Sequence, residues 1–356
     1  MKLKNLALTA FFTAFLFTSC SKDDDPIVET PLGGYVDGTL ILNQGGFGNG
    51  NASVSFLSND IATFQNNIFS LINPTLTLGD TAQDIGFYNE LAYIVLNGSN
   101  KIEIVNRYTL KHIASITTGL SNPRYIVFAN GKGYVSNWGA GSSTTDDYIA
   151  VINLTSNTLL SPIAISEGPE RMVVSNNKVY VAQLGGYGYG TTVSVINLSN
   201  NAVSSINVGD VPNSMEVYDG NLYVLNGGKP SWAGTETSGK LTKINLSNDT
   251  VSSSIDFAAA THPSNLEIEN GDLYYTVDSG IFKTSVTATT LPATSLFTTT
   301  AQGVYGVYSF AVRNSKIYVG DAVDYSSNGK VYLYSLTGTL VSSKTVGVIP
   351  AGFYFN

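Results

Sequence analysis

Short segments in which apolar and polar residues alternate follow one another along most of the chain, with glycine- or asparagine-containing turns between them. The clearest example is residues 263–277, where an alternating segment, an Asn-Gly turn at 270–271 and a second segment beginning Leu-Tyr-Tyr follow in order. A side-chain period of two is typical of strands, and Asn-Gly between two strands indicates a hairpin. Beyond the first twenty residues no segment shows the helical period convincingly, so the pattern predicts an all-β fold.

The same hairpin recurs along the chain as part of a longer repeat. A tyrosine opens its second strand at positions 41 to 51 residues apart, namely Tyr93, Tyr134, Tyr180, Tyr223, Tyr274 and Tyr318. A third strand follows, as at 193–198 and 241–246, and then a fourth, as at 202–208 and 251–257. Four short strands in each repeat of this length are the pattern of a β-propeller blade, and they favour it over a stacked β-solenoid.

The repeats number seven when the two ends of the repeated region are combined. The first repeat, at 40–57, lacks an opening strand, and the last, at 350–355, consists of an opening strand alone. Pairing these two parts would complete one blade and leave no open sheet edge in the ring. We therefore predict a seven-bladed propeller of four-stranded blades over residues 38–356, closed by the C-terminal strand joining the first blade.

The N-terminal residues have the pattern of an export signal. Lys2 and Lys4 precede an apolar stretch at 6–17, which is too short to span a bilayer comfortably, and Cys20 follows as the only cysteine. This order resembles a bacterial lipobox, which would make 1–19 a signal peptide and Cys20 the lipidated residue. An ordinary signal peptide with an incidental cysteine is the alternative.

Residues 20–37 read as a flexible, acidic tether that contains prolines, glycines and three consecutive aspartates at 23–25. An acidic run directly after the lipidated cysteine resembles the export signal of some Gram-negative surface lipoproteins, although a solvated spacer is the plainer interpretation. The N-terminal features together predict a lipid-anchored protein of the outer membrane that faces the cell exterior.

Composition removes several classes of function. The chain of 356 residues has 18 basic and 26 acidic side chains and a net charge of −8, so nucleic acid is a poor partner. One cysteine and two histidines exclude an internal disulfide, a cysteine-rich zinc site and a multi-histidine metal site. The segment Gly-Tyr-Gly-Tyr-Gly at 186–190 lies between two strands and lacks the helix that a dinucleotide site needs. The chain also has no Gly-x-Ser-x-Gly motif, the common signature of serine hydrolases. Because all these signals are missing, we expect neither an enzyme nor a cofactor nor a bound metal.

Glycine-rich loops between the second and third strands carry large rings that loop structure alone does not require. In a four-stranded meander these loops share one face of the disc with the crossings between blades. Aromatic rings bury much area at low entropic cost and, as Tyr and Trp, also form hydrogen bonds. We expect an aromatic collar there, although rings that fold down between blades are the alternative; the candidates are Phe47, Trp138, Tyr187, Tyr189, Trp232 and Tyr325.

The third residue of each opening strand is expected near the channel mouth on that same face. These residues are Asp84, Tyr125, Arg171, Ser214, Asn265, Ser309 and Gly352. Arg171 is the only cation in this ring and Asp84 the only carboxylate, so the two could orient a polar ligand, or could pair with neighbouring blades instead. Asn226, which begins one long loop, is a further candidate for amide contacts.

Three short segments resemble the YVTN family of bacterial propellers: Tyr-Val-Ser-Asn at 134–137, Tyr-Val-Ala-Gln at 180–183 and Tyr-Val-Leu-Asn at 223–226. Segments 41–56, 78–84 and 96–103 are similar to the DUF5074-type surface lipoproteins that capture vitamin B12 beside an outer-membrane transporter, and to their uncharacterised relatives. The resemblance implies a corrinoid such as cobalamin as bound ligand and a TonB-dependent transporter as partner. A closed propeller has no sheet edge that demands a partner, so we expect the chain to be otherwise monomeric. A carbohydrate- or protein-binding adhesion module is the alternative, and a metal-dependent lyase or lactonase ranks third.

Overall fold

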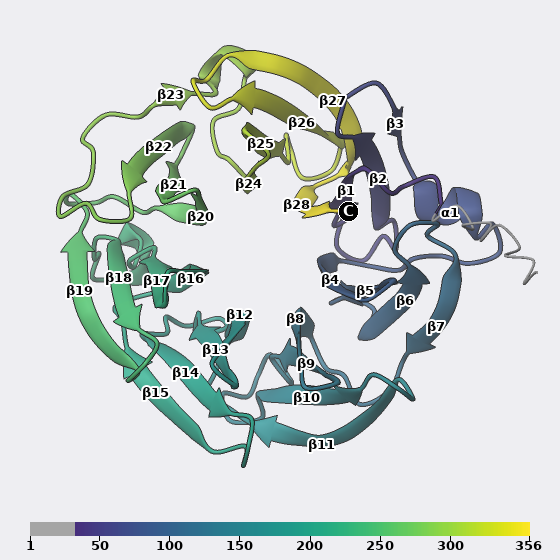
Figure 1. Ribbon diagram of the computed structural model, residues 1–356, viewed down its shortest axis with the longest axis horizontal. Coiled ribbons are helices and arrows are strands. Elements are labelled where there is room, and N and C mark those ends of the chain that lie inside the picture. Colours follow the sequence, from purple (N-terminus) through teal and green to yellow (C-terminus); the bar gives the residue numbers. More distant parts are fainter. Residues whose placement is uncertain (1–32) are drawn as a thin grey trace, which may run out of the picture. The chain divides into compact units, whose positions relative to one another are not determined.

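The computed structural model describes residues 33–356 as one unit. The predicted signal peptide, Cys20 and most of the predicted tether lie outside the described residues. Within the described part, seven four-stranded antiparallel sheets surround a central axis as the blades of a ring (Figure 1). The prediction of an all-β, seven-bladed propeller is confirmed.

The blades contain the following strands. Blade 1 contains β28 (Pro350–Phe355), β1 (Gly38–Asn43), β2 (Ser53–Ser58) and β3 (Phe64–Gln65). Blade 2 contains β4 (Ala82–Tyr88), β5 (Leu91–Leu96), β6 (Lys101–Asn106) and β7 (His112–Ile116). Blade 3 contains β8 (Pro123–Ala129), β9 (Lys132–Asn137), β10 (Tyr148–Asn153) and β11 (Thr158–Ala164). Blade 4 contains β12 (Pro169–Ser175), β13 (Lys178–Gln183), β14 (Thr192–Asn197) and β15 (Val203–Asn207). Blade 5 contains β16 (Pro212–Tyr218), β17 (Asn221–Asn226), β18 (Lys240–Asn245) and β19 (Thr250–Asp256). Blade 6 contains β20 (Ser264–Glu269), β21 (Asp272–Val277), β22 (Gly280–Ser285) and β23 (Phe297–Thr298). Blade 7 contains β24 (Ser309–Arg313), β25 (Lys316–Asp321), β26 (Asn328–Ser335) and β27 (Leu340–Val348).

The ring closes as the sequence predicts. Strand β28 is the innermost strand of blade 1 and pairs antiparallel with β1, from Thr39 opposite Phe355 to Asn43 opposite Pro350. Figure 1 shows the yellow C-terminal strand beside the purple N-terminal strands at this junction. Because each end of the ring supplies what the other lacks, blade 1 has the same four strands as its neighbours.

The repeated tyrosines explain how neighbouring blades are joined. Their rings are buried between sheets, and several hydroxyl groups reach the outer turn of the next blade. Tyr93 of blade 2 donates a hydrogen bond to Asn157 of blade 3 at 3.0 Å, and Tyr180 of blade 4 donates to Asp249 of blade 5 at 2.6 Å. A buried ring with a paired hydroxyl therefore serves both the core and the contact between blades.

The two faces of the disc differ in their connections. The loop face carries the second-to-third loops of each blade and the crossings between blades, and the turn face carries the other connections. Five second-to-third loops are long, whereas blades 2 and 6 use short turns at 97–100 and 278–279. The crossing from β3 to β4 contains the short helix α1 (Ile68–Ile72), which the apolar pattern did not predict. Among residues 33–356, no helix has the length and apolar character needed to cross a membrane.

Inner strands line the central channel, and most of them begin irregularly. Six of the seven, all except β24, show a register shift near their first residues. In β4, for example, Ala82 pairs with Leu96 and Asp84 pairs with Val95, so β4 has one extra residue between these two pairs. Such a β-bulge inserts an extra residue and re-aims the side chains around it. The bulges decide which residues reach the channel mouth.

Candidate functional site

The loop face carries the most exposed aromatic rings of the described residues. Every large apolar side chain that is more than 60% exposed lies there: Phe47 at 84%, Tyr187 at 80%, Trp232 at 84%, Tyr305 at 77% and Tyr325 at 61%. Tyr305 belongs to the crossing from blade 6 to blade 7 and is not among the rings predicted from the second-to-third loops. Exposed apolar groups confined to one face are typical of a binding surface.

The loop of blade 5 holds Trp232 in place through its own hydrogen bonds. The ring sits in the short helix η1 (Ser231–Ala233), and Thr237 on the returning part of the loop donates to Asp210 at 2.8 Å. The Lys229 backbone N–H donates to the Thr237 hydroxyl at 2.8 Å, and the Lys229 ammonium lies 3.4 Å from Asp210. The loop is therefore braced against the preceding crossing while its tryptophan stays exposed.

Two other loops present their rings in a similar way. Asp324 accepts hydrogen bonds from the backbone N–H groups of Ser326 at 2.9 Å and Ser327 at 2.6 Å, which fixes the turn that displays Tyr325. These backbone hydrogen bonds lower the pKa of Asp324. In blade 1, the Gly48 N–H beside Phe47 donates to Asp80 at 2.9 Å. Rings on braced loops lose little freedom when a ligand binds.

Trp138 and Tyr189 differ from the freely exposed rings. The Trp138 indole N–H donates to the Pro169 carbonyl at 3.2 Å, and the Arg124 guanidinium lies 4.4 Å from its ring centre. Its edge meets the Tyr187 ring at 5.8 Å between centroids, so Trp138 supports Tyr187 from below. Tyr189 is 40% exposed.

The expectation that the third residues of the inner strands line the mouth is only partly correct. A cavity of about 230 Å³ at the loop-face end of the channel is lined mainly by second residues, with Tyr125 and Arg171 as the third residues that reach it. The β-bulges account for this difference because the extra residue turns the second side chain toward the axis. The second residues at the mouth are Gln83, Arg124, Glu170, Asn213 and Ala351, and Tyr308, which directly precedes β24, joins them.

Other third residues connect neighbouring blades. Asp84 is buried and accepts hydrogen bonds from the Ile126 N–H at 2.9 Å and the Tyr354 hydroxyl at 3.0 Å. Asp84 therefore pairs with the two neighbouring blades, which is the alternative to orienting a ligand. Burial raises the pKa of Asp84, and these two donors together with Arg171 oppose the rise. Asn226 is fully buried and donates to the Gly209 carbonyl at 2.9 Å, so it cannot reach a ligand on the loop face.

Polar pairs organise the mouth itself. The Arg124 guanidinium donates to Glu170 at 2.9 Å, and the Tyr308 hydroxyl donates to the Gln44 side chain at 2.6 Å. Burial raises the pKa of Tyr308 to about 12, which keeps its hydroxyl a donor at neutral pH. The mouth therefore offers hydrogen-bonding groups below the aromatic rings.

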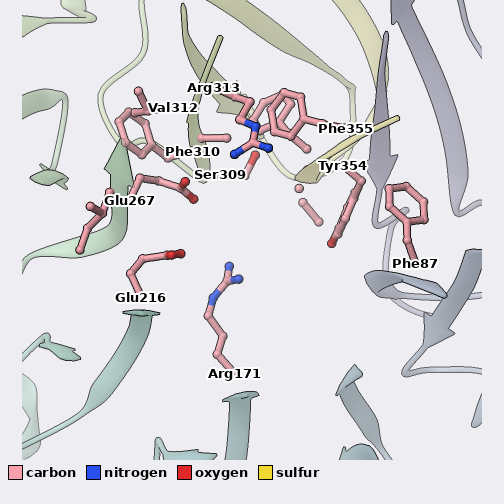
Figure 2. A pocket seen from close by; sticks show the side chains of 15 residues that line it. Phe87, Arg171, Glu216, Glu267, Ser309, Phe310, Val312, Arg313, Tyr354 and Phe355 are labelled. Carbon is pink, nitrogen blue, oxygen red and sulfur yellow. The ribbon is translucent and has the colours of Figure 1, made fainter. Parts of the chain in front are cut away.

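Figure 2 shows the side chains around a second cavity, of about 400 Å³. Late residues of the inner strands line it, so it lies farther along the channel toward the turn face. Arg171 lines both cavities, so its side chain stands at their junction. Glu216 of β16 and Glu267 of β20 point into the second cavity, and Tyr354 and Phe87 lie on its other side. Sequence reasoning missed both glutamates, although each occupies the fifth position of its repeat, counted from Pro212 and Pro263, where most other repeats place an uncharged residue.

The two glutamates have unusual proton affinities. Burial raises the pKa of Glu216 to about 7, while the Arg171 guanidinium opposes the rise. Burial, and next the charge of Glu216, raise the pKa of Glu267 well above its ordinary value. Among residues 33–356, no three histidine, cysteine, aspartate or glutamate side chains gather in a group that could hold a metal ion.

Comparisons with known proteins place the fold. A quinonprotein alcohol dehydrogenase-like protein from Bacteroides thetaiotaomicron has a TM-score of 0.64 and 15% identity over 90% of this chain and 78% of that one. A functionally unknown protein from Desulfotomaculum acetoxidans has a TM-score of 0.62 and 12% identity over 90% of this chain and 98% of that one. BamB from Moraxella catarrhalis has a TM-score of 0.53 and 15% identity over 91% of this chain and 89% of that one. Such low identities show a shared fold alone. No curated protein matches the chain. A family model described as "Domain of unknown function (DUF5074)" matches residues 37–356, and the chain therefore belongs to the DUF5074 family.

Proposed function

We propose that the chain is a ligand-capture protein that binds a corrinoid such as cobalamin on its loop face and passes it to an outer-membrane transporter. The observation that carries the proposal is the confinement of the most exposed large apolar side chains to that face, with Phe47, Tyr187, Trp232, Tyr305 and Tyr325 as its aromatic collar. A collar of rings around a polar mouth suits a wide ligand with apolar surfaces and an amide-bearing edge.

The resemblance of segments 41–56, 78–84 and 96–103 to vitamin B12-capturing lipoproteins supports the choice of ligand. The braced loops support a site formed before the ligand arrives, because Asp80, Asp210 and Asp324 hold the loops of three different blades. In this proposal the chain binds cobalamin as cargo rather than as cofactor, carries out no reaction, and uses a TonB-dependent transporter as partner.

The decisive experiment titrates cyanocobalamin into the chain from residue 26 onward by calorimetry and follows the red colour on gel filtration. A saturable one-to-one isotherm with co-elution is the expected result. Absence of both heat and co-elution would refute corrinoid capture. Retention on a polysaccharide column would then favour the carbohydrate-binding alternative.

Variants locate the site on the collar. The double variant Phe47→Ala and Trp232→Ala should weaken binding at least about tenfold, since each ring offers a large apolar contact and neither supports the core. Ile113→Ala, which removes a half-exposed apolar side chain on the outer strand β7, is the control and should bind as the unaltered protein does. Unchanged affinity in the folded double variant would remove the ligand from the collar.

The cellular location is part of the same proposal and depends on Cys20, outside the described residues. Replacement Cys20→Ala in the full chain should abolish incorporation of a labelled fatty acid and release the protein from the outer-membrane fraction. Unchanged labelling would contradict lipidation at Cys20.

A further inference from the structure

The cavity on the turn-face side of Arg171 has the features of a second binding site, separate from the aromatic collar. It is lined at its outer end by the last residues of the inner strands, among them Phe87, Ile268, Arg313 and Phe355, so it opens on the face opposite the collar. Its volume of about 400 Å³ lies within the range of cavities that hold small molecules.

Three ionisable side chains converge on this cavity without pairing with one another. Arg171, Glu216 and Glu267 project from the neighbouring inner strands β12, β16 and β20 (Figure 2). Among the described residues, none of the three forms a salt bridge within 4.0 Å. Arg171 contacts the Tyr125 ring at 4.9 Å.

The three charges differ in exposure: Glu216 and Glu267 are partly buried, whereas Arg171 is exposed to the channel. The enclosing strands reduce the solvation of both carboxylates, and a partner of opposite sign would compensate for that loss. Arg313 stands exposed at the turn-face rim and is not among the charges that shift the pKa of either glutamate. Two guanidinium groups, of Arg171 and Arg313, and two carboxylates therefore line the hollow, and Arg171 is the one whose charge acts on both glutamates.

The opposite wall of the cavity is aromatic. Phe87 and Tyr354 lie on this side of the hollow, on β4 and β28; the Arg107 guanidinium already covers one face of the Phe87 ring at 3.7 Å, and Phe355 packs on Tyr318. The Tyr354 hydroxyl is already committed to Asp84, so the wall contributes ring surface more than hydrogen bonds. Aromatic faces attract organic cations as well as apolar groups.

We propose that this cavity binds a small zwitterion of the amino-acid type, with its ammonium group between Glu216 and Glu267 and its carboxylate at Arg171. A molecule with both charges satisfies both signs at once, which neither a simple cation nor a simple anion does. Its short carbon chain packs against Phe87 and Tyr354. The site is independent of the collar and of the corrinoid proposal, because its cavity opens on the other face.

Three compounds with the same five-carbon chain test this charge pattern: 5-aminopentanoate, pentylamine and pentanoate. Calorimetric titration of residues 26–356 at pH 7.5 should give saturable one-to-one binding of 5-aminopentanoate. Pentylamine and pentanoate, each lacking one charged end, should bind at least about tenfold more weakly, because each loses one charge-assisted pairing. Equal binding of all three compounds, or binding of none, would overturn the proposal.

Variants assign the two ends of the ligand. The double variant Glu216→Gln and Glu267→Gln should lose binding of 5-aminopentanoate, and Arg171→Met should reduce its affinity to that of pentylamine. Glu90→Gln removes an exposed glutamate at a turn and is the matched control, with unchanged binding expected. Circular dichroism verifies that each variant is folded. Unchanged binding in the folded double-glutamine variant would refute the assignment.

The collar variants separate this proposal from the first one. Phe47→Ala with Trp232→Ala should leave 5-aminopentanoate binding unaltered while it weakens cyanocobalamin binding. Loss of 5-aminopentanoate binding in those variants would place the zwitterion on the loop face and overturn the channel site.

Discussion

Replacing Glu216 with glutamine should stabilise the propeller at alkaline pH and change how its stability depends on pH. Burial raises the pKa of Glu216 from 4.5 to about 7 in the folded protein, so between these values the folded state binds protons that the unfolded state has released. Stability therefore falls as the pH rises through this window, and the loss is complete above pH 7. Glutamine has a similar shape and no charge, so it removes this contribution.

The size of the effect follows from the two pKa values. One pKa unit corresponds to about 1.4 kcal/mol, so the shift sets an upper limit of about 3 kcal/mol for the stability lost at pH 8. Solvent in the open channel screens the charge, and we therefore expect a gain of about 1–2 kcal/mol for Glu216→Gln at pH 8. Glu267 titrates together with Glu216, so part of the pH dependence remains in the variant.

Urea unfolding at a series of pH values from 4 to 8.5 measures this prediction. The charged groups that act on Glu216 are Arg171 and Glu267, on the two neighbouring inner strands; Glu267 is affected in turn by Glu269, and Arg171 by Tyr125, Tyr354 and Asp84. The variant should show a smaller loss of stability between pH 4.5 and 7 than the unaltered protein. A variant that is less stable at pH 8, with an unchanged pH slope, would show that the Glu216 carboxylate is stabilised in the fold and would refute the argument.

Three further predictions concern the closure of the ring and the contacts between blades. Deleting residues 350–356 removes the innermost strand of blade 1, so the shortened chain should lose its cooperative thermal transition in circular dichroism; a sharp melt at the original temperature would contradict closure by β28. Asp84→Ala leaves the Ile126 N–H and the Tyr354 hydroxyl without their acceptor and should lower the free energy of unfolding in urea by about 2–3 kcal/mol. Tyr180→Phe removes only the hydrogen bond to Asp249 and should lower it by about 1–2 kcal/mol, whereas no change would mean that this contact between blades 4 and 5 contributes nothing.

The fold could be predicted because the structural information in this chain is repeated. The tyrosine that opens each second strand recurs in six blades, and the two incomplete repeats at the ends are complementary. Each copy offers the same evidence for strand, turn and burial, so an ambiguous blade is interpreted from its neighbours. Helix α1 was missed for the opposite reason, since it occurs once, in a crossing, and is only five residues long.

The candidate site could be predicted only where topology alone decides the position. Phe47, Tyr187 and Trp232 lie in second-to-third loops and are exposed, and the alternation of the strands fixes the face on which such loops lie. The channel mouth depends on β-bulges, and the sequence does not reveal where an extra residue enters a strand. Asn226 has a loop-like sequence context, yet it is fully buried and bonded to a crossing.

Comparison among the blades themselves shows why function is best sought at the inner strands. Positions needed by every blade carry similar residues, such as the buried tyrosines and the proline that starts four of the inner strands and directly precedes a fifth. The second, third and fifth positions of the same strands hold residues that differ in size and charge from blade to blade, and they converge on one axis. A repeated fold does not require this variety, because any small polar side chain would satisfy a solvated channel. The unpaired Arg171, Glu216 and Glu267 are the extreme case, since their charges stand where uncharged residues serve most other blades. An asymmetric set of charges inside a nearly symmetric ring is what recognition of an asymmetric ligand requires.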